Sequence, residues 1–324
     1  MSDFSEMLPI SIVQDPSLDP LSANMASSYA TANQHIAQEH QAHFSLQREH
    51  IAASRLAILN TAEKALQRTP ASEGPRRAIV LGAGNCIDIP VAELAASFDK
   101  MTLVDAHIES VKEAVSRLPG KLIAKINVVG ADISGVAGEI GSVMEQTAQR
   151  RTSYAEYARS LAPRLNRIDP AGKPPDLGED YTFACSQLVL SQLGGIPFSV
   201  LGKRLAEQYE MPISNELTPA QVSLLDATTE ATIRLQKSHV EYLARLVRSS
   251  GTVHLADTYA EVKKNSAQQQ LLPMVMVGEV QPVIDRHFEN LTPLEDWYWP
   301  PRPNRLYYVI ANSLAPRGYR TSQA

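Results

Sequence analysis

The chain has 324 residues, of which 44% are hydrophobic and 20% are charged, and its formal net charge at pH 7 is -5. This composition is ordinary for a globular protein with a substantial core, and the length allows one large domain or one domain with an appendage. The 30 lysines and arginines form no basic run, which argues against a nucleic-acid partner. The only cysteines, Cys86 and Cys185, exclude a disulfide framework and do not suit a structural zinc site.

The start of the chain carries acidic residues where a secretory signal would carry lysine or arginine. The longest uncharged stretch, residues 182–202, contains glutamine, serine, paired glycines and a proline, so it does not read as a membrane span. We therefore expect a cytoplasmic protein that has no membrane partner.

The first 70 residues are predicted to form an arm followed by a helical segment. Residues 1–20 hold three prolines and little periodicity, which predicts an irregular arm. Residues 22–67 contain neither glycine nor proline and are rich in helix-forming residues. Four histidines fall in this segment, and we expect packing or hydrated side chains there and no metal site; they are His35, His40, His43 and His50.

The breaker at residues 69–75 marks the start of a second domain, predicted to span residues 75–324. Short apolar strands at residues 78–81, 101–104 and 124–129 alternate with helical patterns at 90–98 and 108–118. Further strands are predicted at 181–186, 251–256 and 306–313. Alternation of this kind predicts a doubly wound α/β fold with a mostly parallel sheet and crossover helices.

Two long insertions, residues 134–179 and 194–250, interrupt this alternation and look largely helical. Ligands of open α/β sheets bind outside the carboxyl ends of the strands, where such insertions leave the sheet. We therefore expect residues 22–67 and 134–179 to cover a ligand crevice.

A glycine turn follows the first strand of the second domain. Gly82, Ala83, Gly84 and Asn85 form a Gly-x-Gly turn, where the backbone can approach a ligand closely. The pattern alone is weak, because a purely structural strand–helix turn also uses glycine. Dinucleotide-binding turns carry a third glycine where this chain has Ile87, which disfavours a pyrophosphate ligand.

Two carboxylates follow the next two strands. Asp105 ends the second strand about 20 residues after the glycines, where an acid accepts hydrogen bonds from ribose hydroxyls. Asp132 follows the third strand, and there a carboxylate could bind an adenine amino group; capping a helix or forming a turn is the alternative.

These residues resemble the class I S-adenosylmethionine-dependent methyltransferases. The family's first motif is an acidic residue, any residue, then Gly-x-Gly-x-Gly. Gly82 and Gly84 match its first two glycines, whereas Cys86 stands at the third and Val80 replaces the acid. The segment 181–193 resembles the family's fourth strand, with Gln192 where histidine is frequent. Residues 297–299 and 305–314 resemble its terminal hairpin; one of Trp297 and Trp299 could line a substrate pocket, with core packing as the alternative.

The resemblance implies a seven-stranded, mostly parallel sheet and S-adenosylmethionine as the cofactor. Residue by residue, it implies a cofactor site made of Gly82, Ala83, Gly84, Asn85, Asp88, Asp105, Ala106, Asp132, Ile133, Ser186 and Gln187.

The predicted function is in-line methyl transfer to a small-molecule acceptor. The candidates for a catalytic side chain are His107, Gln192 and Asp257, without a ranking. The alternatives are an NAD(P)-dependent oxidoreductase, an aminocarboxypropyl transferase that uses the same cofactor, and an inactive methyltransferase fold acting as an interaction protein. A homodimer is left open.

Overall fold

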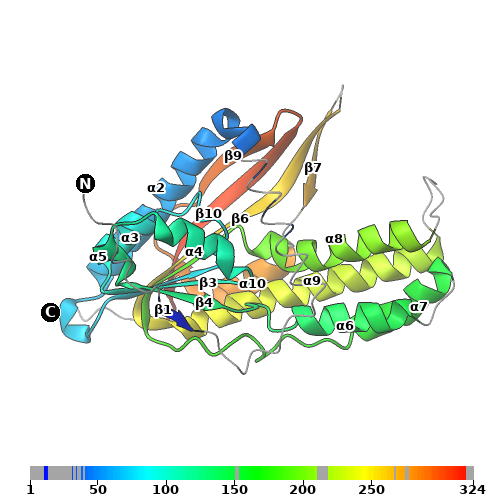
Figure 1. Cartoon of the computed structure of the whole chain (residues 1–324), viewed down its shortest axis with the longest axis horizontal. Coiled ribbons are helices and arrows are strands. Elements are labelled where there is room, and N and C mark those ends of the chain that lie inside the picture. The colour runs from blue at the N-terminus through cyan, green and yellow to red at the C-terminus, as the bar shows by residue number, and fades with distance from the viewer. Residues whose placement is uncertain are drawn as a thin grey trace, which may run out of the picture.

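The computed structural model describes residues 11–13, 41–149, 153–209, 218–265, 268–273 and 277–318, and the isolated positions 31, 34 and 38 (Figure 1). Within these ranges, no helix combines the length and the apolar composition that crossing a membrane requires. His35 and His40, together with most of the predicted helical segment before residue 41, lie outside the described residues.

The strands form one mixed sheet. In chain order they are β1 (Ser11–Val13), β2 (Arg77–Leu81), β3 (Lys100–Asp105), β4 (Ile126–Gly130), β5 (Tyr181–Gln187), β6 (Val247–Asn265), β7 (Gln268–Pro273), β8 (Phe288–Asn290), β9 (Glu295–Arg302) and β10 (Arg305–Pro316). Their spatial order is β1-β4-β3-β2-β5-β6-β10-β8, with β7 paired to β6 and β9 paired to β10. Along this path, each strand from β1 through β4, β3, β2 and β5 to β6 runs parallel to its neighbour. Strand β10 is antiparallel to both β6 and β8.

The predicted α/β sheet of mostly parallel strands is confirmed, but the residues that the structure describes form ten strands and not seven. One extra strand, β1, comes from the arm predicted to be irregular, so that prediction is wrong at residues 11–13. Ser11, Ile12 and Val13 pair in parallel with residues 127–129 of β4. Two of these three residues are β-branched aliphatics, which favour a strand, and β4 would otherwise leave its backbone groups unpaired at the sheet edge.

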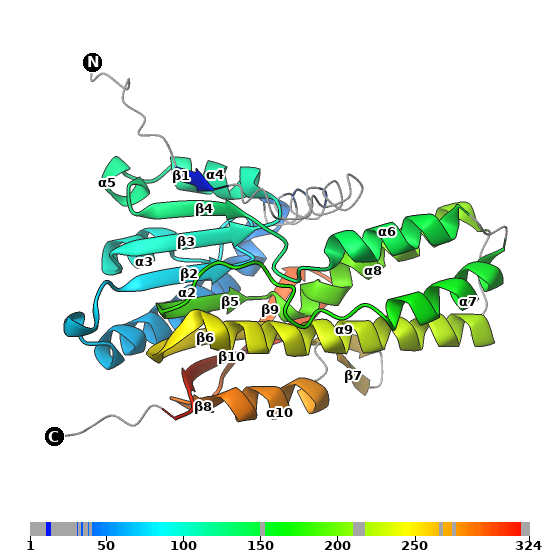
Figure 2. The same ribbon diagram turned by 90° about the horizontal axis from the view of Figure 1, so that it is seen from below.

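The helices alternate with the strands and also supply both insertions. In chain order they are α2 (Phe44–Arg68), the 3-10 turn η1 (Ala71–Glu73), α3 (Val91–Ser97), α4 (Ile108–Ser116), α5 (Gly120–Ile123), α6 (Ala137–Ala148), α7 (Tyr154–Leu165), α8 (Leu190–Gln208), α9 (Pro219–Leu246) and α10 (Val277–His287). Figure 2 shows α6, α7, α8 and α9 side by side, running away from the ends of β3 and β4.

Strand β2 shows how the sheet divides the core into two layers. Its side chains alternate between the two faces, as the pleat requires. Ala78 and Val80 pack in the layer formed with α2, α3 and α4. Ile79 and Leu81 pack in the layer that includes α6, α7, α8, α9 and α10. All four residues are completely buried, and β2 lies between β3 and β5 in the middle of the sheet.

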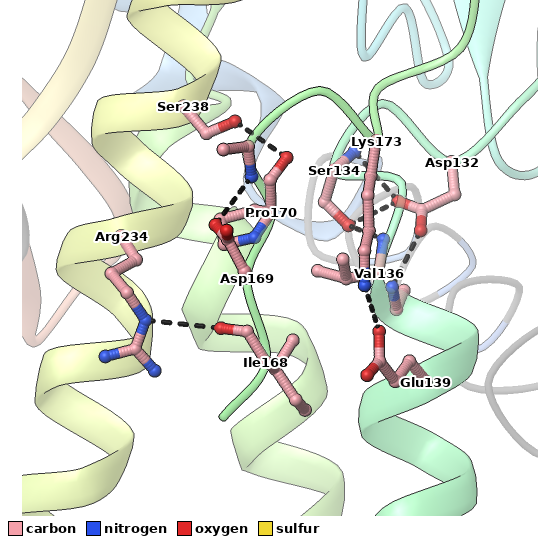
Figure 3. A network of polar contacts seen from close by, with 12 residues as sticks. Asp132, Ser134, Val136, Glu139, Ile168, Asp169, Pro170, Lys173, Arg234 and Ser238 are labelled. Atoms are coloured by element: carbon pink, nitrogen blue, oxygen red, sulfur yellow. Dashed lines mark hydrogen bonds and ion pairs between the residues drawn. The ribbon is translucent and has the colours of Figure 1, made fainter. Parts of the chain in front are cut away.

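The loop after α7 contacts one helix from each of the two insertions, α6 and α9 (Figure 3). Lys173 Nζ lies 2.6 Å from Glu139 Oε2 on α6. On the other side, Ser238 Oγ on α9 donates a 3.1 Å hydrogen bond to the carbonyl oxygen of Pro170. The loop therefore fills the space between α6 and α9, although long stretches of sequence separate these helices.

We predict that Gly135→Ala separates this loop from α6. Gly135 has φ +68°, and an added Cβ would lie 2.1 Å from the carbonyl oxygen of Lys173, which is backbone and cannot rotate away. The left-handed conformation costs an alanine about 1–2 kcal/mol, and the overlap adds about 1–3 kcal/mol. Chemical denaturation should show a loss of about 2–5 kcal/mol in the free energy of unfolding.

Gly172→Ala is the matched control, because Gly172 has φ +71° and no heavy atom within 4 Å of an added Cβ. This variant should lose only the part of the free energy of unfolding that comes from the left-handed conformation, about 1–2 kcal/mol. Equal losses for the two variants would contradict the packing of the loop against α6.

Candidate functional site

The turn after β2 is built on three residues in the left-handed region of backbone space. They are Gly82 (φ 66°), Gly84 (φ 52°) and Cys86 (φ 55°). Cys86, which stands at the third glycine of the resembled motif, thus adopts a conformation that favours glycine. At Gly82 a Cβ would lie 2.7 Å from a methyl carbon of Val189, so glycine is also required there for space. The turn keeps the geometry of a glycine motif even where one glycine is replaced.

Asp105 holds this turn against the end of β3. Its Oδ2 accepts a 2.8 Å hydrogen bond from the backbone N–H of Gly84, and its Oδ1 accepts a 2.7 Å bond from the N–H of His107. The side chain is 8% exposed. Each carboxylate oxygen has more than one lone pair, so this geometry leaves acceptor capacity for a ligand hydroxyl.

Asp132 forms a turn and caps α6. Its Oδ1 accepts hydrogen bonds from the N–H and the hydroxyl of Ser134, at 2.9 and 2.7 Å, and its Oδ2 accepts one from the N–H of Ala137 at 2.7 Å. The capping alternative weighed for this residue is therefore present in the structure. Capping and ligand contact are compatible, because Asp132 also borders the cavity described next.

A cavity with about 1100 Å³ of empty space, including its opening to solvent, lies at the carboxyl ends of β2, β3, β4 and β5. All but one of the predicted cofactor residues border it, namely Gly82, Ala83, Gly84, Asn85, Asp88, Asp105, Ala106, Asp132, Ile133 and Gln187. The structure thus brings together residues from four separate strand ends.

Ser186 is the predicted residue that the cavity lining does not include. It is fully buried, and its Oγ lies 2.9 Å from Nε2 of His239 on α9. Its neighbour Gln187 borders the cavity and bonds instead to Ser54 of α2. Successive residues of a strand point to opposite faces, so the two side chains could not both reach the same site.

The three catalytic candidates lie in different surroundings. Gln192 borders the cavity. His107 does not: it lies at the start of α4, where its Nδ1 is 2.9 Å from the hydroxyl of Ser110. Asp257 was expected at a strand end facing the crevice, and this is wrong, because β6 continues to Asn265 and Asp257 is 1% exposed within it.

Asp257 instead anchors the first turn of α8. Its Oδ1 accepts hydrogen bonds from the backbone N–H groups of Ser191, at 3.1 Å, and Thr258, at 2.6 Å. Burial raises the pKa of this carboxyl group from 3.8 to about 7, although hydrogen bonds from Ser191 and Thr258 oppose the shift. Because the same turn carries Gln192 to the cavity, Asp257 affects the cavity through α8.

The remaining walls of the cavity come from segments far away in the sequence. Helix α2 contributes Gln47, His50 and Ile51, α8 contributes Gln192, Leu193 and Ile196, and β9 contributes Trp299. The expectation for the N-terminal helical segment therefore agrees with the position of α2. For residues 134–179 the expectation is wrong, since none of them is among the lining residues; α8 occupies that place.

His50 and Trp299 are cavity residues that sequence patterns indicated only weakly. Packing or hydration was expected for His50, and the structure shows packing: His50 is 2% exposed and stacks on Trp299 with ring centroids 4.5 Å apart. Trp297, two residues away on the same strand, donates a 2.8 Å hydrogen bond to Nδ1 of His50. The alternation of Trp297 and Trp299 along a strand was the available signal, and it could not identify the partner helix.

Three buried groups near the site, Cys86, His239 and His254, are neutral at neutral pH. Burial, with help from Asp88 and Asp105, raises the pKa of Cys86 to about 12. Burial lowers the pKa of His239 to about 4 and that of His254 to about 3. Within the described ranges, no cluster of three or more His, Cys, Asp or Glu side chains could hold a metal ion.

No protein-family model matches the chain, and no curated protein sequence matches it. Solved structures to which this chain is similar include the 1,6-didemethyltoxoflavin N1-methyltransferase of Burkholderia thailandensis, at 13% identity and TM-score 0.41, covering 94% of this chain and 93% of that one. A SAM-dependent methyltransferase of Leishmania major is 10% identical at TM-score 0.41, with coverage of 92% and 85%. The [4+2]-cyclase SpnF is 11% identical at TM-score 0.40, with coverage of 82% and 81%.

We predict that Asp257 makes the stability of the protein depend on pH. A carboxyl pKa that is higher in the folded state means that the folded protein binds the extra proton between pH 3.8 and about 7. The free energy of unfolding should therefore fall as pH rises through this window, by up to about 4 kcal/mol from this group. Asp257→Asn keeps an oxygen that can accept the same hydrogen bonds and should remove this fall.

Urea denaturation at several values between pH 4 and pH 8 tests this, with the exposed Asp285→Asn as the control. The Asp257→Asn variant should gain stability relative to wild type as pH rises. Parallel stability curves for wild type and Asp257→Asn would contradict the raised pKa.

Proposed function

We propose that this protein transfers a methyl group from S-adenosylmethionine to a small-molecule acceptor. The observation that carries the proposal is the convergence of the glycine turn at Gly82–Gly84 with Asp105 and Asp132 on one cavity at the carboxyl ends of adjacent parallel strands. Open α/β sheets bind nucleoside ligands at this edge. Asp105 would accept from the ribose hydroxyls, and Asp132 with Ile133 would face the adenine.

The charge of the cavity supports this cofactor. Asp88, Asp105 and Asp132 border it, and no lysine or arginine is among the lining residues. A negative cavity attracts a cationic sulfonium and an ammonium group. It repels the pyrophosphate of NAD(P), which also prefers the N-terminus of a helix close to its glycine turn. Here α3 begins only at Val91, and Ile87 stands where the dinucleotide motif has glycine.

When bound, S-adenosylmethionine supplies an electrophilic methyl group on its sulfonium. The residues of this chain would bind the nucleoside, align an acceptor in line with that methyl and keep water out. The apolar residues Ile51, Leu193 and Ile196 cover the cavity from α2 and α8 and serve the last purpose. Proximity and alignment are therefore the main contributions that we assign to the protein.

The cofactor assignment predicts binding of S-adenosylhomocysteine with a dissociation constant in the micromolar range, about -8 kcal/mol. Isothermal titration calorimetry with S-adenosylhomocysteine, S-adenosylmethionine and NAD measures it directly. Saturable binding of NAD without binding of S-adenosylhomocysteine would overturn the proposal in favour of an oxidoreductase. Binding of none of the three would favour an interaction protein.

Asp105→Ala should weaken the binding of S-adenosylhomocysteine by about 2–3 kcal/mol, because the ribose hydroxyls lose a charged acceptor and Gly84 loses the bond that holds its turn. The control is Asp99→Ala, just before the opposite end of β3, where Oδ2 of Asp99 accepts a 2.9 Å hydrogen bond from the N–H of Arg76. That variant also loses a carboxylate–backbone bond but should keep its affinity. Equal effects in the two variants would show that Asp105 acts only on the fold.

A further inference from the structure

Three glutamines border the cavity, and the fold itself uses the side-chain amides of two of them. The amide of Gln47 on α2 donates a 2.8 Å hydrogen bond to the carbonyl oxygen of Pro301. The amide of Gln187 donates to Oγ of Ser54 at 3.1 Å, and its oxygen lies 3.0 Å from Nε2 of His254. Both amides therefore connect α2 or β6 to other parts of the fold.

Gln192, the third of these glutamines, is placed differently. Within the residues that the structure describes, its side-chain amide has no hydrogen-bond partner. Of the residues that line the cavity, all of them in the described ranges, only Gln192 is exposed. It therefore lies where the cavity opens to solvent, and its amide is available to a ligand.

The backbone that carries Gln192 is fixed from two sides. The N–H of Ser191 donates a 3.1 Å hydrogen bond to Oδ1 of Asp257 on β6. The carbonyl oxygen of Leu190 accepts a 3.1 Å hydrogen bond from the side-chain amide of Gln236 on α9. The first turn of α8 is thus held against β6 and α9. A ligand would have to order only the side chain of Gln192, which lowers the cost of binding.

The surroundings of Gln192 suit the apolar body of a neutral ligand. Ile196 follows it by one helical turn, and Leu193 lies between them on the same cavity wall. Ile51 of α2 and the ring of Trp299 on β9 border the same cavity. No lysine or arginine is among its lining residues in the described chain, so an anionic group would find no counter-charge there.

The chemistry of a carboxamide specifies the ligand edge that matches Gln192. A carboxamide holds a hydrogen-bond acceptor and a donor on the same carbon atom, and it does not titrate at neutral pH. It can therefore bind an acceptor but cannot serve as its general base. A ligand edge that places an N–H beside a carbonyl oxygen forms two hydrogen bonds with it. An edge with only one of these groups leaves half of the amide without a partner.

Building on the proposed function, we propose that Gln192 is a specificity-determining residue for the acceptor. It binds neutral heterocycles whose ring edge carries an N–H beside a carbonyl group, as in a lactam. The rest of the ring lies against the apolar residues of α2 and α8. Compounds of similar shape that lack the N–H, or that carry a carboxylate in place of this edge, bind more weakly.

The side-chain amide signals of Gln192 in a nitrogen–proton correlation spectrum report on this contact directly. We would saturate the ¹⁵N-labelled protein with S-adenosylhomocysteine and titrate it with quinazolin-4-one, a neutral bicyclic lactam. The compound 3-methylquinazolin-4-one keeps the ring and the carbonyl group but lacks the N–H, and quinoline-4-carboxylate is the anionic probe. Gln192→Leu assigns the side-chain signals, and the shifts of backbone amides give the dissociation constants.

Quinazolin-4-one should move the side-chain amide protons of Gln192 downfield and bind about fivefold more tightly than either other probe. Gln192→Leu should remove this preference for the N–H. Gln192→Glu should weaken quinazolin-4-one about fivefold and strengthen the binding of benzamidinium, because a carboxylate only accepts hydrogen bonds and benzamidinium offers two donors. A residue that only supported the fold would not exchange one preference for the other.

Gln67→Glu is the matched control, because Gln67 is exposed on α2 and is not a lining residue. It should bind both quinazolin-4-one and benzamidinium as wild type does. An equal change of preference in the Gln67 and Gln192 variants would show a general effect of charge and would contradict the proposed contact.

The outcomes separate the role of Gln192 from the proposed function. If S-adenosylhomocysteine binds but quinazolin-4-one does not move the Gln192 signals, the role of Gln192 is wrong and the cofactor assignment stands. If 3-methylquinazolin-4-one or the carboxylate binds as tightly as quinazolin-4-one, the selection for a lactam edge is wrong. If S-adenosylhomocysteine does not bind, the proposed function fails, and Gln192 fails with it as an acceptor-binding residue.

Discussion

The carboxylate of Asp105 connects the parts of the site that define it. It accepts hydrogen bonds from the N–H of Gly84 in the turn after β2 and from the N–H of His107 in the turn after β3. The carbonyl oxygen of the same residue accepts a 3.0 Å hydrogen bond from the N–H of Ala131 after β4. Three consecutive strand ends of the sheet are therefore held together by one residue. The walls formed by α2, α8 and β9 can enclose a ligand only if this edge of the sheet is held in place.

The two sides of the cavity differ in chemistry, and the strand-end side supports the proposed cofactor. The strand ends supply carboxylates and backbone turns, which suit a cationic nucleoside cofactor. The opposite side, formed by α2 and β9, carries the stacked rings of His50 and Trp299. Between them lie the apolar residues of α2 and α8, such as Ile51 and Ile196.

Local sequence patterns were enough to predict the elements that have a strong hydrophobic pattern or a clear turn residue at their end. The short apolar run of β2, the glycine turn and the acid ending β3 all act over a few residues, and their predicted positions agree with the structure. Patterns with a weaker local signal failed. Strand β1 has only three residues, and it forms by pairing with the edge of β4. Asp257 lies inside a strand longer than its apolar core suggested, so its carboxyl group is buried and not at an opening.

The sequence by itself determined the α/β alternation, the turn at Gly82–Gly84 and the positions of Asp105 and Asp132, because these follow from the geometry of single strands and the turns that end them. Only the tertiary structure decided that His50 meets Trp297 and Trp299, that Gln187 and not Ser186 reaches the cavity, and that α8 replaces the 134–179 insertion as its cover. His50 and Trp297 are 247 positions apart. Their contact depends on how α2 packs across β6 and the β9–β10 hairpin, and no local pattern encodes that packing.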